Sequence, residues 1–338
     1  MKVAVDATPL SVPTGGITRY TAELVKALQD NHPQATFTLL SQPNSNWIMR
    51  RWWSCGLPLA LLRQGFDLFH GTDFAVPYLP VKPSVMTLHD LSPFLPDSPP
   101  GLSRRVRRRA PVLIGLGLAS MIITPTEAIR RQALDSFRLH PGRVAAIHLA
   151  APDHFRPLDV PPPSPPYFLF LGTLEPRKNL QTIIDAWRQV RAAHQVDLVL
   201  AGRRRVDFPP LPNEPGLLLL GAVPEHDLPQ LYSGATAVLF PSLYEGFGLP
   251  VLEAMQCGAP VIASRDPAVL EVSGTAALTL PATDTSLWVQ AMAALIDNRA
   301  MRQELRAAGL RRAAAFSWRD TARQTMEVYE EARRRFDA

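Results

Sequence analysis

The chain has 338 residues, 46% hydrophobic and 19% charged, and this length and balance predict about two globular domains and exclude a disordered chain. The sequence holds only two cysteines, which excludes a disulfide scaffold, a cysteine-rich zinc module and an iron–sulfur protein. Residues 1–166 carry 17 Lys and Arg against 11 Asp and Glu, and the remainder carries 18 against 19, so the net charge of +5 divides into +6 and −1.

Short apolar runs alternate with helical patterns from the start of the chain. The first run, Val3–Val5, is followed by a breaker at Thr14–Gly16 and by apolar residues at helical spacing from Ile17 to Leu28. Short apolar strands that alternate with helices predict a parallel sheet with helices on both faces. Further strands are expected at residues 37–40, 66–70, 85–88, 121–124 and 144–149.

A proline-rich segment, residues 157–166, separates this pattern from a second one. Six of its ten residues are proline, which predicts a stiff, extended linker. We therefore expect an α/β fold with two domains, residues 1–160 and 161–316, each a doubly wound parallel sheet. In the second domain strands are expected at residues 167–171, 196–200, 217–220, 237–240 and 260–263, a helix at 180–191, and a long charged helix follows at 317–338.

Ligands of open α/β sheets bind beyond the carboxyl ends of the strands, and two such domains favour the cleft between them. Residues 241–253 follow one expected strand, and Gly246 and Gly248 there allow a ligand to approach the backbone. The amides that open the next helix suit an anion such as a diphosphate. Glu253 has apolar neighbours and needs a partner, for which a ligand's hydroxyl pair is one candidate. A glycine turn with a surface Glu is the alternative.

A second segment, Gly172–Asn179, follows the first strand of the second domain. It places Arg177 and Lys178 just before a helix. Two cations at a strand-to-helix turn suit phosphate oxygens, and a solvated basic turn is the alternative when this segment is taken alone.

Together the two segments resemble the retaining GT-B glycosyltransferases of family 4. The resemblance rests on residues 240–264, with the Glu-x7-Glu spacing of Glu245 and Glu253, and on Gly172–Asn179. It extends over nearly the whole chain through Gly15-Gly16, Leu88-His89-Asp90 and Phe316-Ser317-Trp318. It implies two Rossmann-like domains facing a cleft, with the helix at 317–338 packing back on the first. The combination of Glu-Pro-Arg-Lys-Asn with Leu-His-Asp is most similar to the bacterial branch that adds mannose, or a related 6-deoxyhexose, to surface polysaccharides.

The resemblance also implies roles for particular residues. Arg177 and Lys178 would neutralise the donor's diphosphate, Glu253 would hold the ribose hydroxyls, and Glu245 would contact the donor sugar near its reacting carbon. The implied catalytic residues are His89, Glu245, Arg177 and Lys178. The implied donor-binding residues are Gly16, Arg177, Lys178, Glu245, Gly246, Phe247, Gly248, Leu249 and Glu253, and the acceptor-side residues are Gly15, Arg19 and Asp90. Many relatives have Arg where this chain has Thr173, so Arg177 is expected to supply that charge.

The implied activity is the retaining transfer of a hexose to a glycan or lipid-diphosphate-linked glycan in lipopolysaccharide or related polysaccharide biosynthesis. Mannose from GDP-mannose is the favoured donor. The leaving diphosphate helps to accept the proton of the incoming hydroxyl, so the enzyme mainly positions reactants and stabilises charge. The sequence has no Asp-x-Asp pair and no histidine at zinc-ligand spacing. We therefore expect no metal and no cofactor besides the nucleotide-sugar substrate.

Two other functions fit the same architecture: a sugar-nucleotide epimerase and a non-catalytic GT-B partner subunit. Nucleic-acid binding is disfavoured because no nucleic-acid module is recognisable. No apolar run reaches the ~20 residues of a membrane span, so a cytoplasmic protein is expected. Basic and aromatic residues of the first domain suggest docking on the inner face of the cytoplasmic membrane; they are Arg104, Arg105, Arg107, Arg108 and Arg109, with Trp47, Trp52 and Trp53. Binding of the acceptor's phosphates by the same arginines is the alternative, and both are left open.

Overall fold

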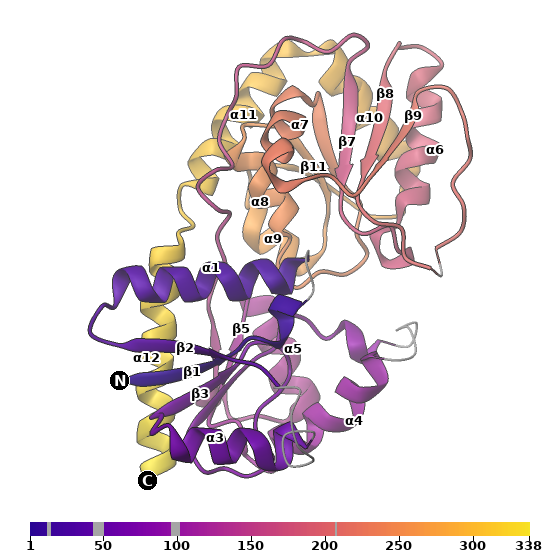
Figure 1. Cartoon of the computed structure of the whole chain (residues 1–338). Coiled ribbons are helices and arrows are strands. Elements are labelled where there is room, and N and C mark those ends of the chain that lie inside the picture. The colour runs from indigo at the N-terminus through magenta and orange to yellow at the C-terminus, as the bar shows by residue number, and fades with distance from the viewer. Residues whose placement is uncertain (12–14, 43–50, 96–101, 207) are drawn as a thin grey trace. The chain divides into compact units, whose positions relative to one another are not determined.

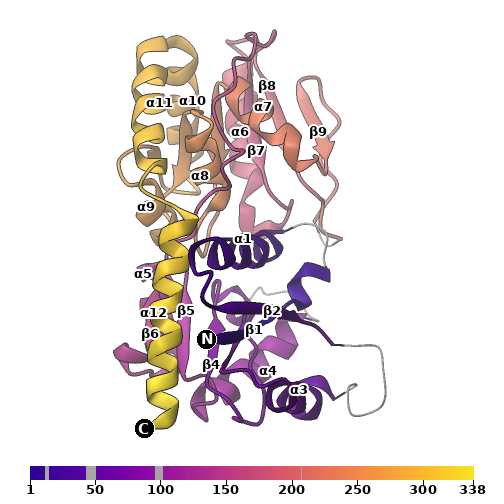
Figure 2. The same cartoon turned by 60° about the vertical axis from the view of Figure 1, so that its left-hand side comes forward.

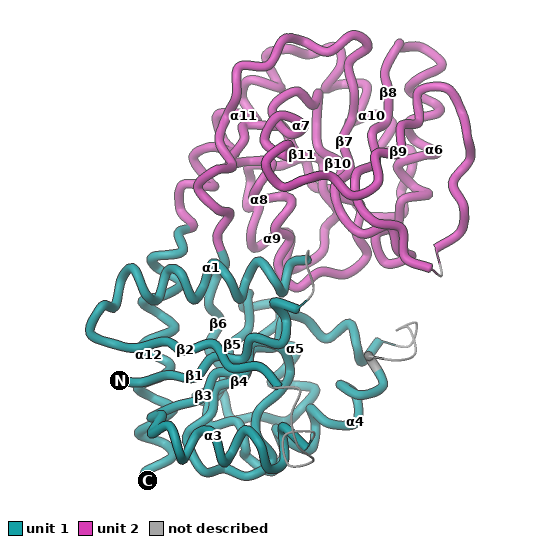
Figure 3. Tube along the Cα trace, in the orientation of Figure 1, with its two compact units in different colours: residues 1–149, 317–338 teal, residues 150–316 magenta. Residues whose placement is uncertain are grey.

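The computed structural model describes residues 1–11, 15–42, 51–95, 102–206 and 208–338. The chain divides into two compact units, residues 1–149 with 317–338 (unit 1) and residues 150–316 (unit 2), as Figure 3 shows. The sequence placed the boundary after residue 160, whereas the units part after Leu149. Residues 150–166 belong to unit 2, and the C-terminal helix belongs to unit 1.

Unit 1 is built on a parallel sheet, six-stranded within the described residues, in the order β2-β1-β3-β4-β5-β6. Figure 2 shows α12 beside α1, and α12 also contacts β4 and β5. The strands are β1 (Lys2–Asp6), β2 (Thr36–Leu40), β3 (Leu68–Gly71), β4 (Ser84–Thr87), β5 (Met121–Thr124) and β6 (Val144–Ala146). The helices are α1 (Gly16–Asn31), α3 (Leu57–Arg63), α4 (Leu102–Gly115), α5 (Glu127–Phe137) and α12 (Trp318–Asp337).

Helix-capping side chains fix where the helices of unit 1 begin. The Thr126 hydroxyl accepts a hydrogen bond from the Ile129 amide at 3.2 Å, so α5 begins directly after it. The Ser317 hydroxyl does the same for the Asp320 amide at 3.1 Å and starts α12. The apolar faces then close over the sheet, with one buried cluster around Leu88 and Leu113 and another around Trp52 and Phe69.

Four buried polar side chains join α12 to the sheet of unit 1. His70 of β3 is fully buried, and its Nδ1 lies 2.7 Å from the Tyr329 hydroxyl of α12. Its Nε2 lies 2.8 Å from the hydroxyl of Thr87, which in turn lies 3.0 Å from the Tyr20 hydroxyl of α1. Because every ring nitrogen has a hydroxyl partner, His70 is a structural histidine that ties three elements together.

The burial of His70 makes unit 1 sensitive to acid. Burial, with a smaller effect of His89, lowers the pKa of His70 to about 3, whereas an unfolded histidine has a pKa near ~6.5. Below that value the unfolded chain binds more protons, so stability falls by up to about 1.4 kcal/mol per pH unit on acidification. We expect His70→Gln to show a shallower pH dependence of the free energy of unfolding. Equal slopes for the two proteins, measured by urea unfolding between about pH 7 and 5, would contradict this assignment.

Unit 2 repeats the architecture with a parallel sheet, six-stranded within the part that the structure describes, in the order β12-β11-β10-β7-β8-β9. The strands are β7 (Tyr167–Leu171), β8 (Asp197–Ala201), β9 (Leu217–Gly221), β10 (Ala237–Phe240), β11 (Val261–Ser264) and β12 (Leu278–Leu280). The helices are α6 (Leu180–Arg191), α7 (Leu228–Gly234), α8 (Leu249–Gln256), α9 (Pro267–Ser273), α10 (Thr285–Asp297) and α11 (Arg299–Ala313), as Figure 1 shows.

Two buried tryptophans anchor the helices of unit 2 on its sheet. Trp187 of α6 and Trp288 of α10 lie in one apolar cluster with residues of β7, β8 and β10. Each indole N–H finds a backbone carbonyl at 3.0 Å, Val196 for Trp187 and Pro281 for Trp288. The large apolar area is therefore buried without leaving a polar atom unsatisfied.

The predicted α/β fold class with two doubly wound parallel sheets is confirmed. The strand order of unit 2 is that of the Rossmann fold, in which the chain runs outward from β7 to β9 and then returns to the other side of β7 as β10. This reversal creates a topological switch point between β7 and β10, where parallel α/β sheets bind their ligands.

Candidate functional site

Backbone hydrogen bonds join the loops that follow β8, β7 and β10 at the carboxyl edge of unit 2. The Leu174 amide donates to the Arg203 carbonyl at 2.8 Å, and the Arg205 amide donates to the Leu174 carbonyl at 3.1 Å. The Leu243 amide donates to the Arg177 carbonyl at 2.9 Å. The two segments predicted from the sequence therefore lie together, with a third loop beside them.

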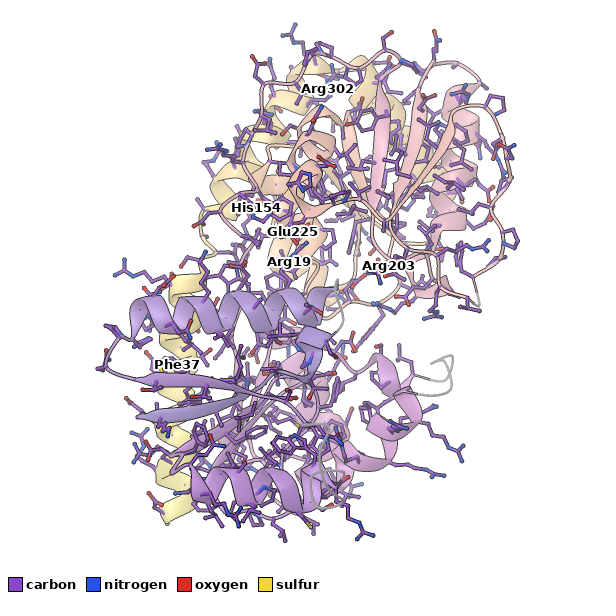
Figure 4. All side chains as sticks on the ribbon, in the orientation of Figure 1. Arg19, Phe37, His154, Arg203, Glu225 and Arg302 are labelled. Atoms are coloured by element: carbon purple, nitrogen blue, oxygen red, sulfur yellow. The ribbon has the colours of Figure 1, made fainter. Side chains whose placement is uncertain are left out.

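A glycine makes the close approach of the first two loops possible. A Cβ atom on Gly202, which has φ +141°, would lie 1.9 Å from the Gly172 carbonyl oxygen. Such a distance is far inside van der Waals contact, so only glycine fits there. Arg203, labelled in Figure 4, then opens the run of three arginines that follows β8.

The charged side chains of these loops form one network. The Lys178 ammonium lies 2.5 Å from Oε1 of Glu245 and the Arg177 guanidinium 3.2 Å from Oε2 of the same carboxylate. Arg177 also donates to the Tyr244 carbonyl and, at 2.7 Å, to Glu175. Arg205 lies 2.6 Å from the other oxygen of Glu175. The two cations predicted to bind phosphate are therefore held by carboxylates at the switch point.

The electrostatics keep Glu245 ionised although it is buried. Burial alone would raise the pKa of Glu245, but the charges of Lys178 and Arg177 lower it below its ordinary value. Lys178 and Glu245 are only 8% and 7% exposed, so their attraction is weakly screened by water. A second anion brought to Arg177 and Lys178 would compete with Glu245 for the same positive charge.

The glycine-rich loop of residues 245–249 turns the chain into α8. Gly248, in the left-handed region with φ +97°, precedes the helix, which begins at Leu249. The amide of Glu245 donates to Asp266 at 3.2 Å, and Asp266 also caps α9. Gly246 and Gly248 thus sit at the opening of α8 as expected, whereas Phe247 is 4% exposed and packs edge-on against Phe316.

Glu253 lies inside α8 and is fully buried, so the alternative of a surface Glu is wrong. The Tyr232 hydroxyl donates to its carboxylate at 2.9 Å. The negative charge of Glu253 also contributes, after burial, to raising the pKa of Cys257 to about 12. The protein itself therefore supplies a partner for the carboxylate, and the role of Glu253 toward ribose stays a prediction.

Unit 1 presents its own predicted residues at the carboxyl edge of its sheet. His89 follows β4, is half-buried, and donates from Nε2 to the Thr72 carbonyl at 2.7 Å. That bond leaves the lone pair of neutral His89 on Nδ1. Asp90 accepts from the Ser92 amide at 2.8 Å. Gly15 and Gly16 mark the start of α1, and Arg19 lies on its first turns, as Figure 4 shows.

The sequence did not single out two further carboxylates of this edge, Asp6 and Asp73. Burial raises the pKa of Asp6, which accepts hydrogen bonds from the amide and hydroxyl of Thr8. Burial also raises the pKa of Asp73, and the charge of Arg109, with that of His89 when its ring is protonated, opposes that rise. Asp6 is the last residue of β1, and Asp73 lies two residues after the end of β3; this position at the carboxyl ends of strands is the signal that could have identified them.

The segments proposed for membrane docking divide in the structure. Trp52 is 5% exposed and belongs to the core of unit 1, so its assignment to a surface is wrong. Trp53 packs against the same core, and the Arg109 guanidinium lies over its ring at 5.0 Å. Trp47 lies outside the described residues. Arg104, Arg105 and Arg108 are exposed on α4, together with Val112 and Leu116 just beyond them.

Among the described residues, no group of three or more His, Cys, Asp or Glu side chains is arranged to hold a metal ion. The helices of the same residues include none that is long and apolar enough to cross a bilayer.

Two family models match successive parts of the chain. The model described as Glycosyltransferase Family 4 matches residues 14–155, and the model described as Glycosyl transferases group 1 matches residues 165–298. The second match contains Arg177, Lys178 and both glutamates of the Glu-x7-Glu spacing.

The chain is also similar to bacterial mannosyltransferases in sequence and to solved glycosyltransferase structures in fold. O-antigen chain mannosyltransferase B of Escherichia coli is 28% identical over 98% of this chain and 100% of its own length. Serotype-specific mannosyltransferase WbdA of the same species is 31% identical over 48% of this chain, a match that spans only 21% of WbdA. The crystal structure of HepE from Anabaena in complex with UDP-glucose superposes with a TM-score of 0.76 at 18% identity and covers 98% of this chain and 99% of HepE. The likeness to HepE shows a shared fold.

Proposed function

Because the chain belongs to the glycosyltransferases of family 4 and group 1, we propose that it transfers mannose from GDP-mannose to a glycan acceptor with retention of configuration. The acceptor class is a glycan or a lipid-diphosphate-linked glycan of a surface polysaccharide. The choice of mannose is supported by O-antigen chain mannosyltransferase B, which this chain matches from end to end.

One observation supports the donor half of this proposal above all others. Arg177 and Lys178 lie at the β7–β10 switch point, next to a glycine-rich turn that opens α8. A nucleoside diphosphate leaves with extra negative charge on its terminal phosphate. Cations placed where that charge develops stabilise the transition state more than the ground state.

The residues of the site divide the work of the reaction. Arg177 and Lys178 take the charge of the departing diphosphate, and Glu245, freed from part of its ion pairing, contacts the donor sugar. In this mechanism a phosphate oxygen of the leaving group accepts the proton of the attacking hydroxyl on the same face. His89, with Nδ1 as acceptor, is the residue of unit 1 proposed to contact the sugar.

The direct test of this function is a donor screen. Purified protein is incubated with GDP-, UDP-, ADP- and dTDP-sugars, and its melting temperature is measured, since a ligand that binds only the folded state raises it. We expect GDP-mannose to give the largest rise and to be hydrolysed slowly or transferred. A protein that binds no nucleotide sugar would act as a non-catalytic subunit, and conversion of the sugar without loss of GDP would indicate an epimerase.

Glu253 gives a sharper prediction about the nucleoside. Glu253→Gln should weaken GDP-mannose binding by about 10- to 150-fold, because a hydrogen bond to a charged group contributes roughly 1.5–3 kcal/mol. Tyr232→Phe is the matched control, since it removes the hydroxyl that Glu253 binds in the protein and leaves the carboxylate for the ribose. Calorimetric titration that finds Glu253→Gln no weaker than wild type would remove Glu253 from the donor site.

The exposed part of α4 supports membrane contact as a further expectation. We propose that Arg104, Arg105 and Arg108 dock on anionic lipid while Val112 and Leu116 reach the interface. Each basic residue near such a surface contributes about 1 kcal/mol. Replacing the three arginines by Gln should abolish co-sedimentation with anionic vesicles and leave activity on a short soluble acceptor. Equal sedimentation of wild type and variant would mean that these arginines face water or the acceptor.

A further inference from the structure

Arg205 and Glu175 extend the charged network outward from the residues that contact the donor. Neither residue is among those that the family resemblance assigns to the site. Glu175 is 12% exposed and lies between two guanidinium groups, with Arg177 at 2.7 Å and Arg205 at 2.6 Å. A carboxylate that accepts from two arginines holds both of them in a fixed geometry.

We infer that Arg205 and Glu175 are positioning residues that set the orientation of Arg177 for the leaving diphosphate, an inference that rests on the proposed donor site. Arg177 is held on two sides, by Glu175 at one terminal nitrogen and by Tyr244 and Glu245 at the other. When a diphosphate replaces Glu245, Glu175 is the carboxylate that still holds the guanidinium in place.

Arg205 has a separate electrostatic task. Among the described residues, the ion pairs of this network join three cations, Arg177, Lys178 and Arg205, to two carboxylates, Glu175 and Glu245, and their charges sum to +1. Without Arg205 the sum is zero, and the charge of Glu175 would repel the incoming diphosphate. Arg205 therefore lets Glu175 orient Arg177 without opposing the ligand.

The ion pair of Arg205 with Glu175 is not required to join the loops that follow β7 and β8. The loops after β7 and β8 are already joined by two backbone hydrogen bonds between Leu174 and residues 203 and 205, at 2.8 and 3.1 Å. The close contact of Gly202 with Gly172 fixes the same two loops. The Arg205–Glu175 pair is thus not needed to hold the loops together. Oε1 of Glu175 instead accepts a hydrogen bond from Arg177.

A double-mutant cycle on pyrophosphate binding tests the inference without requiring turnover. Calorimetry would compare wild type, Arg205→Gln, Arg177→Gln and the double variant. We expect Arg205→Gln to weaken pyrophosphate binding about tenfold in the wild-type background. The loss should be clearly smaller in the Arg177→Gln background, where only the effect of the uncompensated charge of Glu175 remains. Arg205→Lys should restore most of the affinity, since it keeps one ion pair with Glu175.

Arg204→Gln is the control for charge alone, because Arg204 is an exposed neighbour of Arg205 whose charge is screened by salt. Equal losses from Arg205→Gln in both backgrounds would show that Arg205 binds phosphate directly and would overturn the positioning role, as would no loss at all. Unchanged melting temperatures exclude unfolding as the cause. Pyrophosphate binding with the expected coupling, in a protein that uses no nucleotide sugar, would count against the proposed function and not against this inference.

Discussion

Lys178→Gln is expected to lower kcat by about 100- to 1,000-fold, the usual cost of removing one preorganised group that stabilises developing negative charge. The loss should fall on turnover and spare the binding of GMP, because GMP lacks the terminal phosphate at which charge develops. Lys178 is 2.5 Å from Glu245 and almost buried, so its replacement also leaves that carboxylate with one cation fewer.

Steady-state kinetics with GDP-mannose and calorimetry with GMP are the two measurements needed for this variant. Arg191→Gln is a suitable control, since Arg191 is a partly buried arginine of the same unit that forms an ion pair with Asp197 at 2.9 Å. Asp197 is the first residue of β8, so this pair lies at the end of the strand opposite to the candidate site. A loss of GMP affinity as large as the loss of kcat would show that Lys178 supports the fold of the loop and not the transition state.

Glu245→Gln is expected to abolish most turnover while tightening the binding of GDP. Glu245 pairs with both Lys178 and Arg177, so it would compete with a diphosphate for their charge. Removing one partner of a buried ion pair also destabilises a protein by about 3–5 kcal/mol, and GDP should recover part of that loss by taking the place of the carboxylate.

The check on Glu245→Gln is the GDP-dependent rise in melting temperature of the variant compared with wild type. A larger rise in the variant supports competition. A smaller rise would mean that Glu245 assists diphosphate binding and that the ion pairs reinforce the site. The pH dependence of stability is a second check. Because the pKa of Glu245 is lowered in the folded protein, its contribution to the free energy of unfolding is lost as the pH falls below the ordinary carboxylate range. Glu245→Gln should not show this loss.

Local sequence patterns were sufficient for most of the fold. The apolar runs that became β1, β5, β7 and β10 needed only short-range signals, because a strand buried on both faces is a continuous apolar run. The helix predicted at 180–191 is α6 with the same bounds. By contrast, β12 has three residues of intermediate burial, too few to produce a periodic signal.

The candidate site was less accessible from sequence, for two physical reasons. Glycines and charges at strand ends indicated Arg177, Lys178 and Glu245, but not that Glu245 would hold both cations, since ion pairing depends on which strands are neighbours. Arg205 and Tyr232 were missed because they enter from other elements: Arg205 follows β8, and Tyr232 belongs to α7.

The unit boundary lies before the prolines because residues 150–156 already pack with unit 2, where Gln256 donates to the Pro152 carbonyl at 3.0 Å.

The most direct measurement for the central claim is calorimetric titration of GDP and GMP, in EDTA, onto wild type and the Arg177→Gln/Lys178→Gln double variant. If these two cations bind the diphosphate without a metal, wild type should bind GDP at least about tenfold more tightly than GMP, as a charge-assisted contact implies. That difference should vanish in the double variant, with GMP affinity retained. An unchanged preference for GDP in the double variant, or a preference in wild type that appears only when magnesium or manganese is added, would contradict the account.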